Sequence, residues 1–243
     1  MARKGRAARL KEGRVAVPPP SQNFLDDSSL SEQGLAAPRQ KTGRILLIAC
    51  GALAREILAI KASNQLDHID LTCLPAKLHL YPDQISAAVS EAVLKHRPRY
   101  DQIFVVYADC GTGGALAQTC ADLGVEMIAG PHCYSFYEGN EAFAEIAEGG
   151  EITAFYLTDF LVKQFDAFIW RPMGLDQNPE LREMIFGSYT KLVYQSQIQD
   201  PKLVEQAQTC AERLGLEFEH RHTGYGDLET TLTNWAETGS SAE

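Results

Sequence analysis

Hydrophobic runs alternate with amphipathic stretches along most of the chain, and their order predicts the fold. Six apolar runs have the length of a β-strand: residues 44–50, 68–74, 102–107, 125–130, 190–197 and 216–222. Between them, apolar residues recur at helical spacing and predict helices at residues 51–63, 81–98, 115–124 and 200–215. A further helix is expected to begin near Thr158 or Asp159, either of which can cap its first turn.

Strands that alternate with helices pair in parallel, because each helix returns the chain to the end of the sheet where the previous strand began. The sequence therefore predicts an α/β fold, a three-layer sandwich with a mainly parallel, Rossmann-like sheet and helices on both faces. We expect one domain over residues 44–238. Within it, ALAQTCADLGVEM and EQAQTCAERLGLEF resemble each other, and we interpret both as a helix, a glycine stop and a strand.

The first 43 residues differ in composition from the rest. Residues 1–44 hold nine Lys and Arg against four Asp and Glu, a net charge of +5. The opening MARKGRAARLKEGR lacks the apolar core of a secretory signal, although its arginines also suit an organelle transit peptide. The next stretch is rich in Pro, Ser, Asp and Gln without periodicity, which is typical of disorder. We interpret residues 1–43 as a disordered basic tail.

Charge and hydropathy argue against two classes of partner. The chain after residue 44 holds thirteen basic and twenty-eight acidic residues, a net charge of −15, so we expect no nucleic-acid binding. No apolar run approaches the length that crosses a bilayer, so we expect no membrane span. Six cysteines without a secretory signal favour free thiols and a cytoplasmic location. The apolar content permits a homo-oligomer.

Three cysteines stand where predicted strands end. Cys50 closes the first strand, and Cys110 and Cys133 follow the third and the fourth. Because the carboxyl ends of parallel strands share one edge of a sheet, these thiols are expected to converge, with His79 as a fourth donor from the loop after the second strand. Thiolate and imidazole ligands suit zinc or an iron–sulfur cluster. The paired CxxC spacing of many such sites is absent from the sequence.

The glycine turn after Cys110 is a second candidate feature. It precedes a helix whose N-terminal amides would attract an anion, so we predict cofactor contacts from three turn residues: Gly111, Thr112 and Gly113. The turn lacks the full G-x-G-x-x-G spacing, and no Walker lysine follows. Asp109 either contacts a substrate or caps the turn. Tyr134 and Tyr137, just after Cys133, are expected to line the site.

Cys110 also supports a competing interpretation, as the nucleophile of an enzyme. A thiol at a helix N-terminus has a lowered pKa and reacts as the thiolate. The remaining cysteines lie inside predicted elements and are interpreted as small buried hydrophobes: Cys73, Cys120 and Cys210. His220 and His222 alternate along the last strand and are expected to share one polar face.

Four segments, in order, carry a resemblance to a known family: IACGALAREI, LPAKLHLYPDQI, YADCGTGG and PHCYSFYEG. They are similar to the motifs of a bacterial and archaeal domain-of-unknown-function family, number 1638, from about Arg44 to the C-terminal EFEHRHTGYGDLETTL. Members carry a histidine two residues before the third cysteine, where this chain has Pro131. The resemblance singles out the same candidate ligands: Cys50, His79, Cys110 and Cys133.

The resemblance also implies a role beside corrinoid-dependent methyltransferases, in one-carbon metabolism. The expected function is a metal–thiolate protein, because a zinc–thiolate site activates a methyl-accepting thiol and a redox cluster delivers electrons. The Asp-x-His-x-x-Gly pattern of B12-binding domains is absent from the sequence, so cobalamin is not expected to bind in that mode. Two alternatives stay open: a metal-free enzyme that uses Cys110, and a non-catalytic accessory module that binds a small molecule.

Overall fold

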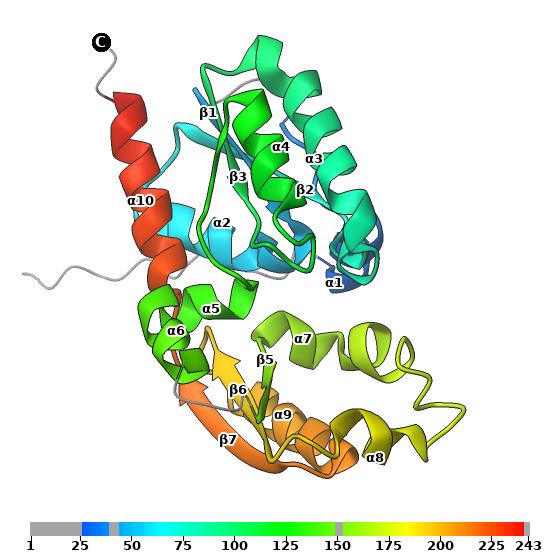
Figure 1. Cartoon of the computed structure of the whole chain (residues 1–243). Helices are drawn as coiled ribbons and strands as arrows, with labels where there is room; N and C mark the ends of the chain where they lie inside the picture. Colours follow the sequence, from blue (N-terminus) through cyan, green and yellow to red (C-terminus); the bar gives the residue numbers. More distant parts are fainter. Residues whose placement is uncertain (1–25, 39–43, 149–152, 241–243) are drawn as a thin grey trace, which may run out of the picture.

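The computed structural model describes residues 26–38, 44–148 and 153–240, and the strands within them form two parallel sheets (Figure 1). The first sheet has the order β2-β1-β3-β4: β1 (Ile45–Cys50), β2 (Ile69–Leu74), β3 (Gln102–Val106) and β4 (Glu126–Met127). The second has the order β5-β6-β7: β5 (Ala154–Leu157), β6 (Lys191–Ser196) and β7 (Glu217–His222). The ladders between these strands are parallel, which confirms the α/β class, with two sheets where one was expected.

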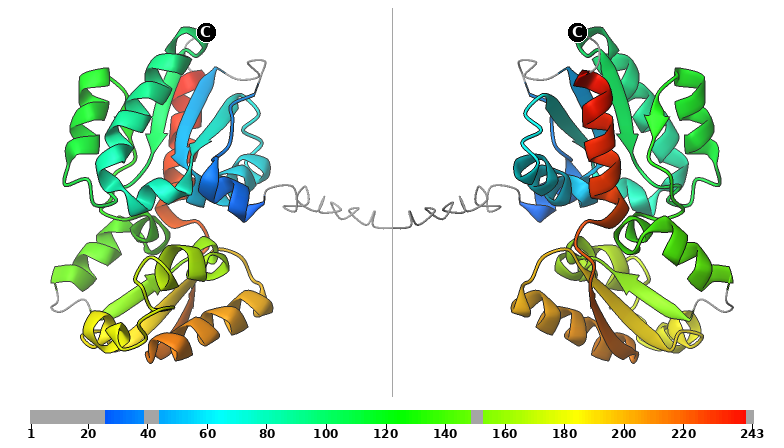
Figure 2. Two further views of the ribbon diagram at one scale, coloured as in Figure 1. Left: turned by 90° about the vertical axis from the view of Figure 1, so that its right-hand side faces the viewer. Right: turned by 90° about the vertical axis from the view of Figure 1, so that its left-hand side faces the viewer.

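Helices cover both faces of the first sheet (Figures 1 and 2). One face carries α3 (Pro82–His96) and α4 (Ala115–Leu123), and the other carries α2 (Ala54–Ser63) and α10 (Gly226–Ser240). Every residue of β1 is buried as a result, which explains its unbroken apolar sequence. Short 3₁₀ turns adjoin these elements: η2 (Gly51–Leu53), η3 (Ala76–Leu80) and η4 (Arg97–Arg99).

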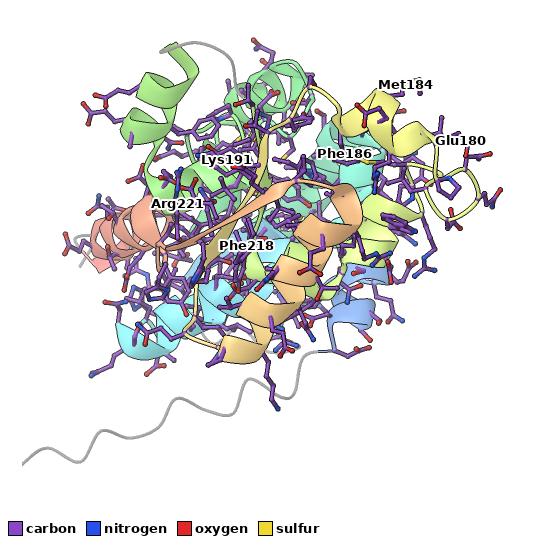
Figure 3. The ribbon with its side chains drawn as sticks, turned by 90° about the horizontal axis from the view of Figure 1, so that it is seen from below. Glu180, Met184, Phe186, Lys191, Phe218 and Arg221 are labelled. Atoms are coloured by element: carbon purple, nitrogen blue, oxygen red, sulfur yellow. The ribbon has the colours of Figure 1, made fainter. Side chains whose placement is uncertain are left out.

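The second sheet lies between two further groups of helices. The first group is α5 (Cys133–Glu138) and α6 (Asn140–Glu148), where Phe143 packs with Tyr156 and Val193 of the sheet. The second group comprises α7 (Asp159–Lys163), the π-helical turn η5 (Asp166–Trp170), α8 (Leu181–Phe186) and α9 (Pro201–Leu214). From below, β7 runs along the outer edge of this sheet beside α9 (Figure 3). Ion pairs hold this edge: Lys191–Glu219 at 2.5 Å and Arg221–Glu138 at 2.8 Å.

We call the first sheet with its helices the first lobe, and β5–β7 with α7–α9 the second lobe. The chain enters the second lobe through α5 and α6 and returns after β7 into α10, which packs on the first sheet (Figure 2). Trp235 of α10 stacks on Phe104 of β3 with ring centroids 4.5 Å apart, and its indole N–H donates to Glu126 at 2.7 Å. One hydrophobic cluster contains buried residues of both lobes.

Part of the predicted disordered tail is ordered, which corrects that prediction for residues 26–38. Asp26 caps α1 (Asp27–Glu32) by accepting from the amides of Ser28 and Ser29. Leu30 is 2% exposed, and Leu35 exchanges backbone hydrogen bonds of 2.8 and 2.7 Å with Cys73. The segment thus covers the outer edge of β2, a tertiary role that its composition does not reveal. Residues 1–25 and 39–43 lie outside the described residues.

The structure contains the predicted strands and helices, although β4 is only two residues long, and it adds the strand β5 and several helices: α1, α5, α6, α8 and α10. Thr158 caps α7 by accepting from the Leu161 amide at 3.4 Å. The two similar segments form equivalent units in different sheets, each a helix ended by a left-handed glycine, Gly124 or Gly215, and followed by a strand. None of the helices in the described parts of the chain has the length and apolarity to cross a bilayer.

Candidate functional site

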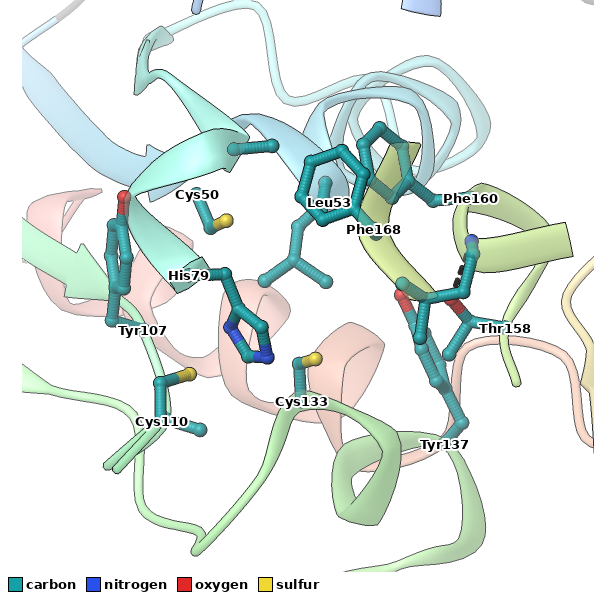
Figure 4. A pocket seen from close by; sticks show the side chains of 14 residues that line it. Cys50, Leu53, His79, Tyr107, Cys110, Cys133, Tyr137, Thr158, Phe160 and Phe168 are labelled. Atoms are coloured by element: carbon teal, nitrogen blue, oxygen red, sulfur yellow. Dashed lines mark hydrogen bonds between the residues drawn. The ribbon is translucent and has the colours of Figure 1, made fainter. Parts of the chain in front are cut away.

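A pocket lies where the carboxyl ends of β1 and β3 face α5 and α7 (Figure 4). All four predicted ligand residues line it: Cys50, His79, Cys110 and Cys133. The cavity has a volume of about 30 Å³. The remaining lining residues are mostly apolar and come from both lobes: Ala52, Leu53, Ala76, Tyr107, Ala108, Tyr137, Thr158, Phe160, Leu161 and Phe168.

Each candidate ligand stands at the end of a different strand or at the start of a helix. Cys50 is the last residue of β1, and His79 lies in η3, directly after β2. Cys110 lies in the turn after β3, where its φ of 49° places it in the left-handed region that residues other than glycine rarely adopt. Cys133 is the first residue of α5. Parallel pairing of β2, β1, β3 and β4 therefore gathers residues that are up to 83 positions apart in sequence.

Burial keeps the three thiols protonated at neutral pH. It raises the pKa of Cys50 to about 11 and that of Cys133 to about 12, where the neighbouring Cys50 adds to the shift. The pKa of Cys110 rises further, through burial and then through Cys133 and Cys50. Partial desolvation and His132 lower the pKa of His79, which is exposed at the pocket mouth. The pocket thus presents neutral thiols and a neutral imidazole.

The three thiols and the His79 imidazole surround the cavity, but they do not converge on one metal position. Figure 4 shows the three sulfur atoms and the His79 ring directed into the same part of the pocket. Among the described residues, no three His, Cys, Asp or Glu side chains are close enough to hold a metal ion in their present positions. A bound ion would therefore have to draw these side chains inward. The chemistry of the set, three sulfurs and one imidazole nitrogen, suits zinc.

The glycine turn is held by hydrogen bonds to its own aspartate, and its predicted cofactor contacts stay a prediction. Asp109 accepts hydrogen bonds from the Gly114 amide at 2.7 Å, the Gly113 amide at 3.1 Å and the Thr112 hydroxyl at 2.8 Å. These bonds hold the pKa of Asp109 below its usual value. The carboxylate therefore occupies the place that an anion would take, and the three residues predicted to contact a cofactor lie outside the pocket lining: Gly111, Thr112 and Gly113.

The glycines beside the cysteines serve the fold. A Cβ on Gly51 would lie 2.5 Å from the carbonyl oxygen of Leu30, so this position allows α1 to approach the first sheet. Gly111 has a φ of 82° and completes the turn beneath Pro82. Both glycines therefore act in packing and turn geometry.

The two candidate tyrosines differ in position. Tyr137 lines the pocket and is 3% exposed. Tyr134 lies outside the lining and stacks between His132, with centroids 4.8 Å apart, and Tyr156, with centroids 5.1 Å apart. Tyr137 is therefore the tyrosine that lines the pocket, and the cofactor contact of Tyr134 stays a prediction.

Sequence reasoning missed Tyr107 and the residues that the second lobe contributes. The Tyr107 hydroxyl is buried without a hydrogen bond of normal geometry, and burial raises its pKa, with the Cys50 thiol as the neighbour of largest effect. The sequence signal for Tyr107 as a pocket residue was its position directly after the apolar strand β3. Thr158, Phe160 and Phe168 come from the second lobe, and the packing of the lobes brings them to the pocket.

The geometry does not support Cys110 as a metal-free nucleophile. Helix α4 begins at Ala115 with Gly114 as its N-cap, so Cys110 is not at a helix N-terminus. Cys110 is also 7% exposed, and its pKa is raised where a nucleophilic thiol needs it lowered.

Comparison with known proteins identifies one family. The family described as "Protein of unknown function (DUF1638)" matches residues 73–232. That range contains three of the candidate ligands, His79, Cys110 and Cys133, and begins after Cys50. No curated protein and no solved structure matches the chain.

Proposed function

This chain belongs to the DUF1638 family of proteins of unknown function, and we propose that it binds one zinc ion through Cys50, Cys110, Cys133 and His79. The observation that carries the proposal is that these four donors, from four separate segments of the chain, line one pocket. Three thiolates and one imidazole make a complete tetrahedral ligand set for zinc.

The size of the pocket favours a single ion. A cavity of about 30 Å³ has room for one or two groups the size of water. Pockets for small organic ligands measure about 300 Å³ or more, and an iron–sulfur cluster contains several iron and sulfide atoms. The volume therefore favours zinc over a cluster and over a small-molecule module.

The His79 position suggests which ligand exchanges. The cysteines are buried or half-buried, whereas His79 is exposed at the mouth of the pocket. We assign His79 as the ligand that a thiol substrate replaces, because catalytic zinc sites keep three protein ligands and one exchangeable position. A zinc ion bound there would lower the pKa of the coordinated substrate thiol, and the resulting thiolate would be nucleophilic.

The one-carbon role remains part of this proposal and rests on the family resemblance. The substrate class would be a thiol that accepts a methyl group, with a corrinoid methyltransferase as partner. Six free cysteines suit a reducing compartment, so we place the protein in the cytoplasm. The zinc-loaded protein is expected to speed demethylation of methylcobalamin by a thiol, and His79→Ala is expected to alter that rate more than it alters zinc content.

The first test is the zinc content of protein purified without oxygen, together with cobalt(II) titration followed by visible absorption. We expect one zinc per chain, and thiolate–cobalt bands that disappear in Cys50→Ala, Cys110→Ala and Cys133→Ala. Binding should strengthen as pH rises from about 6 to 8, because the metal must displace the protons of thiols with raised pKa values.

Cys210→Ala is the matched control, since Cys210 is also buried but lies in α9, outside the pocket lining. It should retain full metal binding. Iron with acid-labile sulfide in the purified protein would replace the zinc assignment by a cluster. Absence of zinc, iron and cobalt binding in the wild type would overturn the proposal.

A further inference from the structure

A second cavity, of about 380 Å³, opens at the carboxyl ends of β6 and β7 beside the start of α9. It shares no lining residue with the cysteine pocket, and its lining combines apolar side chains with a few polar groups: Ser196, Ile198, Gln199, Asp200, Pro201, Val204, His220 and His222. The volume lies in the range of small-ligand sites, and the carboxyl edge of a parallel sheet is where such sites form.

Two histidine rings of β7 lie within hydrogen-bond distance of the Ser196 hydroxyl. The Ser196 Oγ lies 2.9 Å from the Nε2 of His220 and 3.0 Å from the Nδ1 of His222. The same Nδ1 lies 3.1 Å from the Ser196 carbonyl oxygen, which can only accept, so His222 carries its proton on Nδ1. The Ser196 hydroxyl is then free to donate its proton to the Nε2 of His220.

The surrounding residues hold His220 in this orientation. Its ring stacks on Tyr194 of β6, with centroids 5.3 Å apart and an interplanar angle of 17°. The Tyr194 hydroxyl donates to Asp159 at 2.7 Å, and Asp159 also accepts from the amides of Gln197 and Ile198. The imidazole thus rests on a ring that is anchored in the core of the second lobe.

We propose that Ser196 is a nucleophile and His220 its general base, in a site that hydrolyses neutral esters with a small apolar acyl group. A hydroxyl within 3 Å of an oriented imidazole nitrogen is the arrangement that activates serine. Ile198, Pro201 and Val204 provide an apolar wall for the acyl chain, and the Asp200 carboxylate disfavours anionic substrates. Ser196 is 1% exposed, so a substrate reaches it only through the cavity.

The reaction balances without a cofactor. The Ser196 Oγ bonds to the ester carbonyl carbon while its proton passes to the Nε2 of His220. That proton then moves to the departing alkoxide as the ester C–O bond breaks, which leaves an acyl-serine. Water repeats the sequence: it loses a proton to His220, attacks the acyl carbon and releases the carboxylic acid with Ser196 restored.

The test is labelling of the full chain with an alkyl fluorophosphonate, read by intact mass and peptide mapping, together with hydrolysis of p-nitrophenyl butyrate. We expect one adduct, on Ser196, and loss of both signals in Ser196→Ala. His220→Gln should slow labelling by roughly 100-fold or more, the contribution of a general base. His222→Gln should slow it less, because His222 only donates.

His68→Gln is the matched control, since the Nε2 of His68 faces the Ala236 carbonyl in the first lobe, far from the cavity in sequence and outside its lining. It should label at the wild-type rate. Circular dichroism of each variant separates loss of reactivity from loss of fold. Absence of an adduct on Ser196 in the folded wild type, or equal slowing by both strand histidine variants, would overturn the proposal. Zinc content is measured on the same samples and bears only on the cysteine pocket.

Discussion

Glu56, in the first turn of α2, is 5% exposed, and its Oε2 has no hydrogen-bond partner among the described residues. It borders a cavity of about 10 Å³ that Asp159, Lys163 and Tyr225 also line. Burial raises the pKa of Glu56 to about 7, and the nearby Asp159 acts in the same direction. The Glu56 carboxyl therefore changes charge close to neutral pH.

Glu56→Gln is expected to stabilise the protein above neutral pH. The folded-state pKa of Glu56 lies above its unfolded value of 4.5, so its stabilising contribution is complete below pH 4.5 and is lost as pH rises through about 7. A shift of this size corresponds to about 3 kcal/mol. Urea unfolding at about pH 8.5 should show the variant more stable by up to that amount, with a much smaller difference at about pH 5. A gain of equal size at both pH values would contradict this account.

At the scale of elements, α1 shows how a segment of ordinary loop composition gains structure from its neighbours. Its six residues are too few for a stable isolated helix. Leu30 inserts into the core, and the Arg55 guanidinium pairs with Asp27 at 2.7 Å. Tertiary contacts and the Asp26 cap, more than helix propensity, therefore hold α1 in place.

Leu30→Ala is expected to lower the free energy of unfolding by about 2–4 kcal/mol, because it removes a buried side chain and leaves a cavity. Chemical denaturation measures the change. Leu94→Ala in α3 is the control, since Leu94 is 57% exposed and should change stability by less than about 0.5 kcal/mol. Similar small effects from both substitutions would mean that α1 does not pack as described.

At the scale of the whole molecule, two lobes are joined by a chain that crosses between them twice. The second crossing ends in α10, whose Trp235, Leu228 and Leu232 are buried in the common cluster. The cysteine pocket takes residues from both lobes, so its shape depends on how they pack. The shared cluster predicts that the lobes unfold together.

Trp235→Ala is expected to destabilise the whole chain by about 3–5 kcal/mol while unfolding stays a single transition. The substitution removes the stack on Phe104 and the hydrogen bond to Glu126. Fluorescence and circular dichroism should give coincident unfolding curves. Met184→Ala, at a 76% exposed position, is the control and should leave the midpoint nearly unchanged. Two separate transitions in the variant would show that the lobes are independent.

The sequence by itself determined the local elements and their parallel pairing. Buried strands such as β1 have unbroken apolar runs. Gly124 and Gly215 mark the C-terminal ends of α4 and α9, and Pro201 marks the start of α9. It also indicated that Cys50, His79, Cys110 and Cys133 would meet, because each follows a strand of one parallel sheet. The sequence did not predict β5, because its four residues lie in an aromatic stretch in which apolar and polar residues do not alternate.

Only the tertiary structure decided how these elements divide and what surrounds the site. Division of the strands into two sheets, docking of residues 26–38 and return of α10 to the first lobe all depend on contacts between distant segments, which local periodicity does not encode. The same holds for the thiol pKa values, because burial sets them. The Ser196–His220 pair likewise arises from the β6–β7 register, which places two strand ends side by side.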